Sequence, residues 1–112
     1  MNKFMVLYLS SATAANQMAQ ATPEQTQAGM ALWTAWARKA AETIVDMGSP
    51  LGPPVIAAGS APPVDRAVSG FSVLQGETLE AVVELMRDHP HTHAPGAAVE
   101  VHEFLPLPGA QA

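Results

Sequence analysis

The sequence places a carboxylate and an imidazole two positions apart near its end, at Glu100 and His102. Alternation along a strand puts both side chains on one sheet face, about 7 Å apart, which is near enough to line one cavity. Imidazole titrates near neutral pH, so His102 could act as a general base that Glu100 orients. Ser72, which we expect on the same sheet face, is a candidate to bind the ligand. The alternative, which we favour, is a hydrogen-bonded histidine buried between two subunits.

Three further histidines, His89, His91 and His93, occupy alternate positions in a short segment. An extended chain would present them on one side as ligands for a metal ion. No cluster of Asp, Glu or Cys in the sequence completes a tetrahedral set, and His89 also suits the carbonyl end of a helix. We therefore expect a polar loop with no metal and no cofactor. His91 is kept as a candidate to contact a ligand or to orient His102.

Trp36 follows Trp33 by three positions and should lie at the edge of the buried face of a helix. There it could form the wall of a ligand pocket. The interpretation that we favour is packing in the core or against a partner subunit, because a tryptophan buries a large apolar area. Trp36 stays a candidate ligand-binding residue beside that interpretation.

The first elements that must position these side chains are a strand and a long helix. Residues 3–10 are apolar on both faces, which is typical of a central strand covered on two sides. A helix start follows, where Thr22 caps the helix and Gln25 completes a capping box. Apolar residues then recur every three or four positions and predict a helix that ends at Gly48. These residues are Met30, Trp33, Ala37, Ala40, Ile44 and Met47.

The remaining elements complete a β-α-β-β-α-β order. Residues 54–58 are proline-flanked and aliphatic and predict an irregular edge strand, and residues 70–75 predict a third strand. A second helix is expected between the Thr78 cap and Pro90, before a last strand over residues 98–104. This order is the split βαβ arrangement of ferredoxin-like folds, an α+β class with an antiparallel sheet and both helices on one face.

The sheet face away from the helices is expected to be apolar. It should carry Leu74, Phe104 and one alternating set of residues from the first strand. The composition points the same way, because 13% of the residues are charged, against about 25% in typical soluble domains. We therefore expect a second sheet against this face, in a homodimer.

Length and charge limit the remaining possibilities. A chain of 112 residues predicts one domain over residues 1–112, with residues 105–112 as a surface tail. The net charge of -5 gives no attraction for nucleic acid or for an anionic membrane surface. The apolar run at residues 4–9 is shorter than the core of a secretory signal, and no run approaches the roughly 18 residues that span a membrane. We expect a cytoplasmic protein.

Several short motifs along the chain form a recognisable set. They are Trp33 with Trp36, Gly-Pro-Pro at 52–54, Ser-Gly-Phe-Ser at 69–72, Asp-His-Pro-His at 88–91 and Glu-Val-His-Glu-Phe at 100–104. Together they resemble the YCII-related family of small dimeric α/β-barrel proteins over residues 3–109. The resemblance implies a ferredoxin-like protomer whose sheet pairs face to face in a homodimer, with a small cavity between sheet and helix or between sheets.

The resemblance does not extend to a catalytic pair. The family's namesake members carry a His and an Asp proposed to be catalytic, and residues 8–12 hold neither. Related members have Asp-Gly-Pro-Phe entering the third strand, where residues 68–71 are Val-Ser-Gly-Phe. Two functions remain. The first, which we favour, is a non-catalytic homodimeric module with a small-molecule pocket. The second is an enzyme that uses His102 as acid or base on an organic acid or an aromatic compound.

Overall fold

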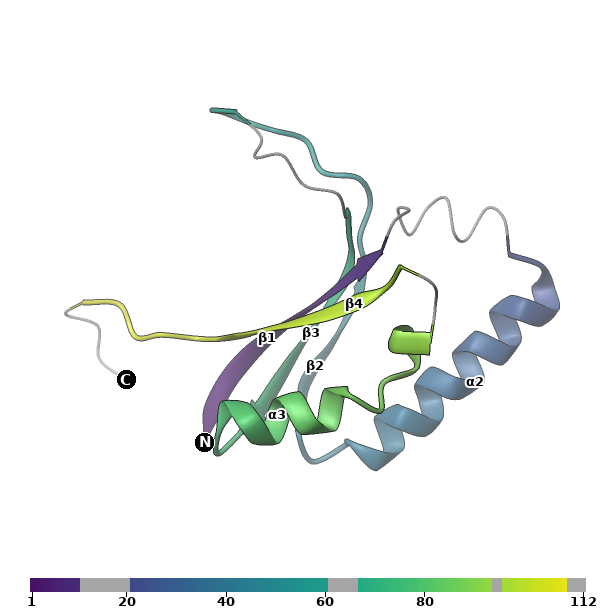
Figure 1. Ribbon diagram of the computed structural model, residues 1–112, viewed down its shortest axis with the longest axis horizontal. Helices are drawn as coiled ribbons and strands as arrows, with labels where there is room; N and C mark the ends of the chain where they lie inside the picture. The colour runs from purple at the N-terminus through teal and green to yellow at the C-terminus, as the bar shows by residue number, and fades with distance from the viewer. Residues whose placement is uncertain (11–20, 61–66, 94–95, 109–112) are drawn as a thin grey trace.

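The chain forms a four-stranded antiparallel sheet with its helices on one face (Figure 1). The computed structural model describes residues 1–10, 21–60, 67–93 and 96–108. Its elements are β1 (Asn2–Ser10), α2 (Pro23–Lys39), β2 (Ile44–Pro50), β3 (Ala67–Gly76), α3 (Leu79–Met86), the 3-10 helix η1 (Pro90–His93) and β4 (Ala98–Glu103). The strand order β2-β3-β1-β4 is that of a ferredoxin-like α+β fold, which confirms the predicted fold class.

The central strand β1 supplies the middle of the core. It pairs with β3 on one side and with β4 on the other, so its backbone is hydrogen-bonded along both edges. Phe4, Val6 and Tyr8 alternate along β1 and are buried on the side of the helices. The rest of the core is Leu74 from β3, Trp36 and Ala40 at the end of α2, and Val82 and Met86 from α3. This core fixes which face of each strand meets the helices.

The orientation of β3 is the reverse of the predicted one. Ser72 lies opposite Val6 in the register between β3 and β1. Leu74 lies opposite Phe4 in the same register, and Ser72 and Leu74 are both fully buried. Residues directly opposite each other on paired strands share a face, so both point toward the helices. The prediction that Ser72 and Leu74 lie on the face away from the helices is wrong.

The sheet face away from the helices is apolar, as predicted, but with different residues from β3. Met5 pairs with Val73, and Leu7 pairs with Phe71. All four side chains are partly buried and lie outside the core cluster. We call these four residues the open face. Within one protomer, no described helix or strand covers these four side chains.

Two extended segments project from the sheet. Residues 51–57 have no regular structure, so the edge strand predicted at 54–58 is wrong, and Val55 is 91% exposed. The tail after β4 exposes Leu105 and Leu107, and Figure 1 shows it running away from the sheet. The radius of gyration is 15.3 Å, compared with about 13 Å for a compact domain of this length. Much apolar side-chain area therefore lies at the surface of one protomer.

The first helix is shorter than predicted. α2 ends at Lys39, and Ile44–Pro50 form the edge strand β2, so the helix end predicted at Gly48 is wrong. Ile44 lies opposite Leu74 and packs against the core. Gly48 has a φ of 78°, and a Cβ there would lie 1.6 Å from the carbonyl oxygen of Phe71. β2 therefore approaches β3 at a point where only glycine fits.

The helix starts are as predicted. The Thr22 side chain accepts a hydrogen bond from the Gln25 N–H, and the Gln25 side chain accepts one from the Thr22 N–H, which completes the capping box. Thr78 caps α3 by accepting from the Ala81 N–H. No helix in the described ranges is long and apolar enough to cross a membrane.

Candidate ligand-binding cavity

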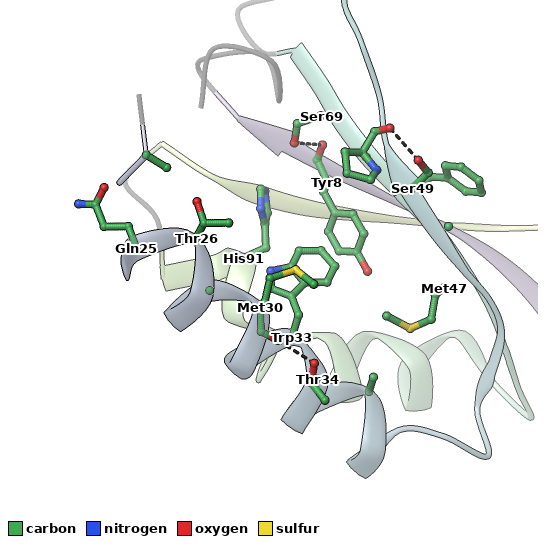
Figure 2. Close-up of a pocket in the computed structure, with 17 residues that line it drawn as sticks. Tyr8, Gln25, Thr26, Met30, Trp33, Thr34, Met47, Ser49, Ser69 and His91 are labelled. Carbon is green, nitrogen blue, oxygen red and sulfur yellow. Dashed lines mark hydrogen bonds between the residues drawn. The ribbon is translucent and has the colours of Figure 1, made fainter. Parts of the chain in front are cut away.

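A cavity of about 540 Å³ lies between α2 and the sheet (Figure 2). α2 forms one wall, the sheet forms the other through β1, β2 and β3, and His91 reaches the cavity from η1. The described lining residues are mainly apolar and include no Asp, Glu, Lys or Arg. Such a lining suits an uncharged organic molecule better than a metal ion or a phosphate group.

Aromatic rings and thioethers are the largest side chains of the lining. The Tyr8 ring centroid lies 5.1 Å from that of Trp33 in an edge-to-face arrangement. The His91 centroid lies 5.4 Å from that of Tyr8. Met30 of α2 and Met47 of β2 add polarisable sulfur atoms from opposite walls (Figure 2). Rings and thioethers of this kind favour a planar aromatic ligand.

His89 fixes the position of η1 against this aromatic wall. It is fully buried, and its ring centroid lies 4.8 Å from Tyr8, 4.3 Å from Trp33 and 4.4 Å from Trp36. Its Nδ1 accepts a hydrogen bond from the His91 N–H at 3.0 Å. An accepting Nδ1 carries no proton, so the His89 ring is neutral. The packing of His89 holds the next residues of η1, and thus His91, beside the cavity.

His91 is the predicted site residue that the structure places at the cavity. Its Nε2 lies 2.7 Å from the carbonyl oxygen of Leu9, which can only accept, so Nε2 carries a proton. The segment is a 3-10 helix, so the extended arrangement considered for His89, His91 and His93 is wrong, and the side chain of His93 lies outside the described residues. No group of metal-ligating side chains is found within the described part of the chain.

A buried hydrogen-bond chain joins Tyr8, Ser72 and Met47. The Ser72 hydroxyl donates to the Met47 carbonyl oxygen at 2.7 Å, and its Oγ lies 2.9 Å from the Tyr8 hydroxyl oxygen. Ser72 is fully buried behind the wall and does not itself line the cavity. Burial raises the pKa of Tyr8 above its ordinary value of 10.0, and the Ser72 hydroxyl, which can turn toward a phenolate, offsets part of that rise.

His102 and Glu100 lie on the face away from the helices, as predicted. His102 is opposite Met5 and Glu100 is opposite Leu7, both on the open face. The imidazole Nε2 is 2.5 Å from the Glu100 carboxylate, and their side chains are 54% and 48% exposed. The two side chains lean toward each other, so the separation of about 7 Å expected from strand spacing is wrong. Because Ser72 is on the other face, the structure does not bring Ser72 together with this pair.

Trp36 belongs to the core and does not line the cavity. It is 4% exposed and packs beside His89, whereas Trp33, one turn earlier on α2, forms the wall. The position of Trp36 fits the interpretation that it packs in the core. Sequence reasoning did not single out Tyr8 or Trp33 as cavity residues. The available signal was a lone phenol within the apolar run of residues 4–9.

Comparisons with known proteins identify the fold. No protein-family model matches the chain, and no curated protein matches it. Among solved structures, a similar one is the 5-chloro-2-hydroxyhydroquinone dehydrochlorinase of Burkholderia phenoliruptrix AC1100, in complex with 2,5-dihydroxybenzoquinone. The TM-score is 0.54 with 16% identity, and the match covers 97% of this chain and 99% of that chain. That protein has the dimeric α/β-barrel fold, and the match shows that this chain shares the fold of one protomer.

Proposed function

We propose that the chain is a homodimeric small-molecule-binding protein of the YCII-related family, with an aromatic ligand in the cavity between α2 and the sheet. The observation that carries the proposal is the wall of Tyr8, Trp33 and His91 around a volume of about 540 Å³. Ligand sites in proteins are concave, mainly apolar and about 300–1,000 Å³ in volume. The cavity meets these criteria and holds a few polar groups that can orient a ligand.

The similar solved structure supports the ligand class. That enzyme is complexed with 2,5-dihydroxybenzoquinone, a molecule with a single ring, and its chain matches this one along nearly its entire length. A fold hosts many activities, so the similarity supports the binding of a ring-sized molecule and not the same reaction. The choice of an aromatic ligand for this chain rests on its own Tyr8, Trp33 and Met30.

The open face supports the homodimer. Met5, Leu7, Phe71 and Val73 form an apolar sheet surface, and a second sheet would remove that surface from water. An isologous pairing places the same face on both protomers, so a single apolar patch is sufficient for association. His102 and Glu100 lie on the same face and would then be enclosed between the two sheets.

A second candidate function rests on that pair. The carboxylate of Glu100 accepts a hydrogen bond from His102 Nε2, which orients the imidazole and leaves Nδ1 of a neutral ring able to take a proton. In this alternative the chain is an enzyme that uses His102 as its acid or base on a small aromatic compound or organic acid held between the sheets. The cavity beside α2 would then be separate from the reacting groups.

The proposed binding site is tested by narrowing the cavity from α2. Thr34 lines the cavity and its neighbour Ala35 is exposed but does not line it. Thr34→Phe should weaken the binding of 4-methylphenol, measured by titration calorimetry, at least about 10-fold because the new ring occupies the ligand's volume. The matched variant Ala35→Phe should bind as the original protein does. Equal affinities for both variants would place any binding elsewhere and reject this cavity as the site.

A further inference from the structure

Three hydroxyl groups that line the cavity donate their protons to carbonyl oxygens of the protein. Ser69 donates to the carbonyl oxygen of Tyr8 at 3.0 Å, and Ser49 donates to that of Pro50 at 2.9 Å. Thr34 donates to the Met30 carbonyl oxygen at 2.8 Å. A hydroxyl has one proton and two lone pairs, so each of these groups offers a ligand only an acceptor.

The Tyr8 hydroxyl also donates its proton within the protein. The partner of its hydroxyl is Ser72 Oγ at 2.9 Å, and the proton of Ser72 already goes to the Met47 carbonyl oxygen. Without a proton between them, two oxygen atoms at this distance would repel each other. The Tyr8 O–H must therefore point at Ser72, and the phenolic oxygen can only accept from a molecule in the cavity.

His91 completes the pattern. Its Nε2–H donates to the carbonyl oxygen of Leu9, so the remaining ring nitrogen of the neutral imidazole is also an acceptor. The side-chain donors left among the described lining residues are Gln25 and Thr26, both in the exposed first turns of α2, and the indole Nε1–H of Trp33. Apart from Trp33 Nε1–H, the polar side-chain groups described above present acceptors to the inner part of the cavity.

We propose that the cavity selects neutral aromatic molecules that carry a hydrogen-bond donor, such as phenols and arylamines, and that the Tyr8 oxygen receives that donor. This inference rests on the proposed function and narrows its ligand class. An aryl ether offers no donor to the cavity's acceptors. A carboxylate would set a negative charge against lone pairs in a protein of net charge -5, without a Lys or Arg in the described lining.

Three probes that differ in one substituent test the selection: 4-methylphenol, 4-methylanisole and 4-methylbenzoate, each titrated into the protein at neutral pH by calorimetry. The phenol should bind about 2- to 10-fold more tightly than the ether, which is the range of one neutral hydrogen bond. The carboxylate should bind most weakly. Equal affinities, or tighter binding of the carboxylate, would overturn this inference and leave the proposed binding function standing. No binding by any probe would overturn both.

Two variants test the assignment to Tyr8. Tyr8→Phe should lower the affinity for the phenol about 2- to 10-fold and leave that for the ether unchanged, because only the acceptor is lost. Ser72→Ala releases the Tyr8 proton toward the cavity, so the ether should bind more tightly relative to the phenol than it does in the original protein. Equal losses for phenol and ether in Tyr8→Phe, or an unchanged ratio in Ser72→Ala, would contradict the assignment. Thermal unfolding of each variant verifies that it is folded before titration.

Discussion

The hydroxyl oxygen of Tyr8 lies 2.9 Å from Oγ of Ser72, within a hydrogen-bond chain that joins the central strands to β2 at Met47. Tyr8 is the sole tyrosine of the chain, so its ionisation can be followed without interference. Its side chain belongs both to the core and to the cavity wall. The properties of this group therefore report on folding and on the cavity together.

The titration of Tyr8 should be displaced upward. Burial raises the pKa of Tyr8 above 10.0, so the ultraviolet absorbance of tyrosinate should develop at higher pH in the folded protein than in denaturant. At pH values between the unfolded and the folded pKa of Tyr8, the unfolded chain binds fewer protons than the folded protein. The contribution of Tyr8 to the free energy of unfolding is therefore fully present below pH 10 and is lost as the pH rises through the folded pKa. Tyr8→Phe should remove that part of the alkaline loss. Coincident folded and denatured titration curves would show that Tyr8 is not buried.

The open face should hold two protomers together. Light scattering should give a mass near twice the 11.7 kDa of one chain at micromolar concentration. Val73→Glu places a charge at the centre of this face and should shift the mass to that of the monomer, since an unpaired buried charge costs several kcal/mol. Ala35→Glu adds the same charge on exposed α2 and should remain dimeric. A monomeric mass for the original protein would contradict the dimer directly.

Gly48 should tolerate no side chain. Gly48→Ala requires a φ of 78° for an L-residue and a Cβ that would lie 1.6 Å from the Phe71 carbonyl oxygen. The free energy of unfolding in urea should fall by at least about 2 kcal/mol. The control Gly29→Ala lies in α2, where a Cβ meets no atom within 4 Å, and should raise stability by about 0.5–1 kcal/mol. If both variants had similar stabilities at equal protein concentration, the close approach of β2 to β3 would be wrong.

The enzymatic alternative makes its own prediction. For any substrate found among small phenols and organic acids, His102→Ala should lower turnover at least about 100-fold, because it removes the proposed acid or base. Glu100→Gln should cause a smaller loss, since the amide oxygen can still accept from His102 Nε2. Both variants should keep the mass of the original protein in light scattering. An unchanged turnover in His102→Ala would reject this histidine as the catalytic group.

Much of the fold was accessible from local sequence signals. The apolar run of β1, the capping box at Thr22 and Gln25, and the cap at Thr78 each act within a few residues, and the structure confirms them. The end of α2 was missed because Ile44 continues the three- and four-residue spacing of the helix although it returns to the core from a strand. One apolar residue at this spacing does not distinguish a continuing helix from the start of a strand.

The candidate site was harder to predict because it depends on pairing over long distances in the sequence. Alternation divides β3 into two sets of residues but does not say which set meets the helices. The pairing with β1 decides which set it is, because Ser72 lies opposite Val6, a core residue of β1. His91 and Leu9 are 82 positions apart, so no local pattern joins them. His102 and Glu100 could be placed on one face because both belong to one short strand.

The binding of a ring in the cavity is tested most directly by methyl NMR of the methionines. Met30 and Met47 line the cavity from opposite walls, Met86 is in the core and Met5 is on the open face. Titration with 4-methylphenol should shift the methyl signals of Met30 and Met47 with one common dissociation constant. The signals of Met5 and Met86 should stay in place. Shifts confined to Met5, or no saturable shift at Met30 and Met47, would contradict binding between α2 and the sheet.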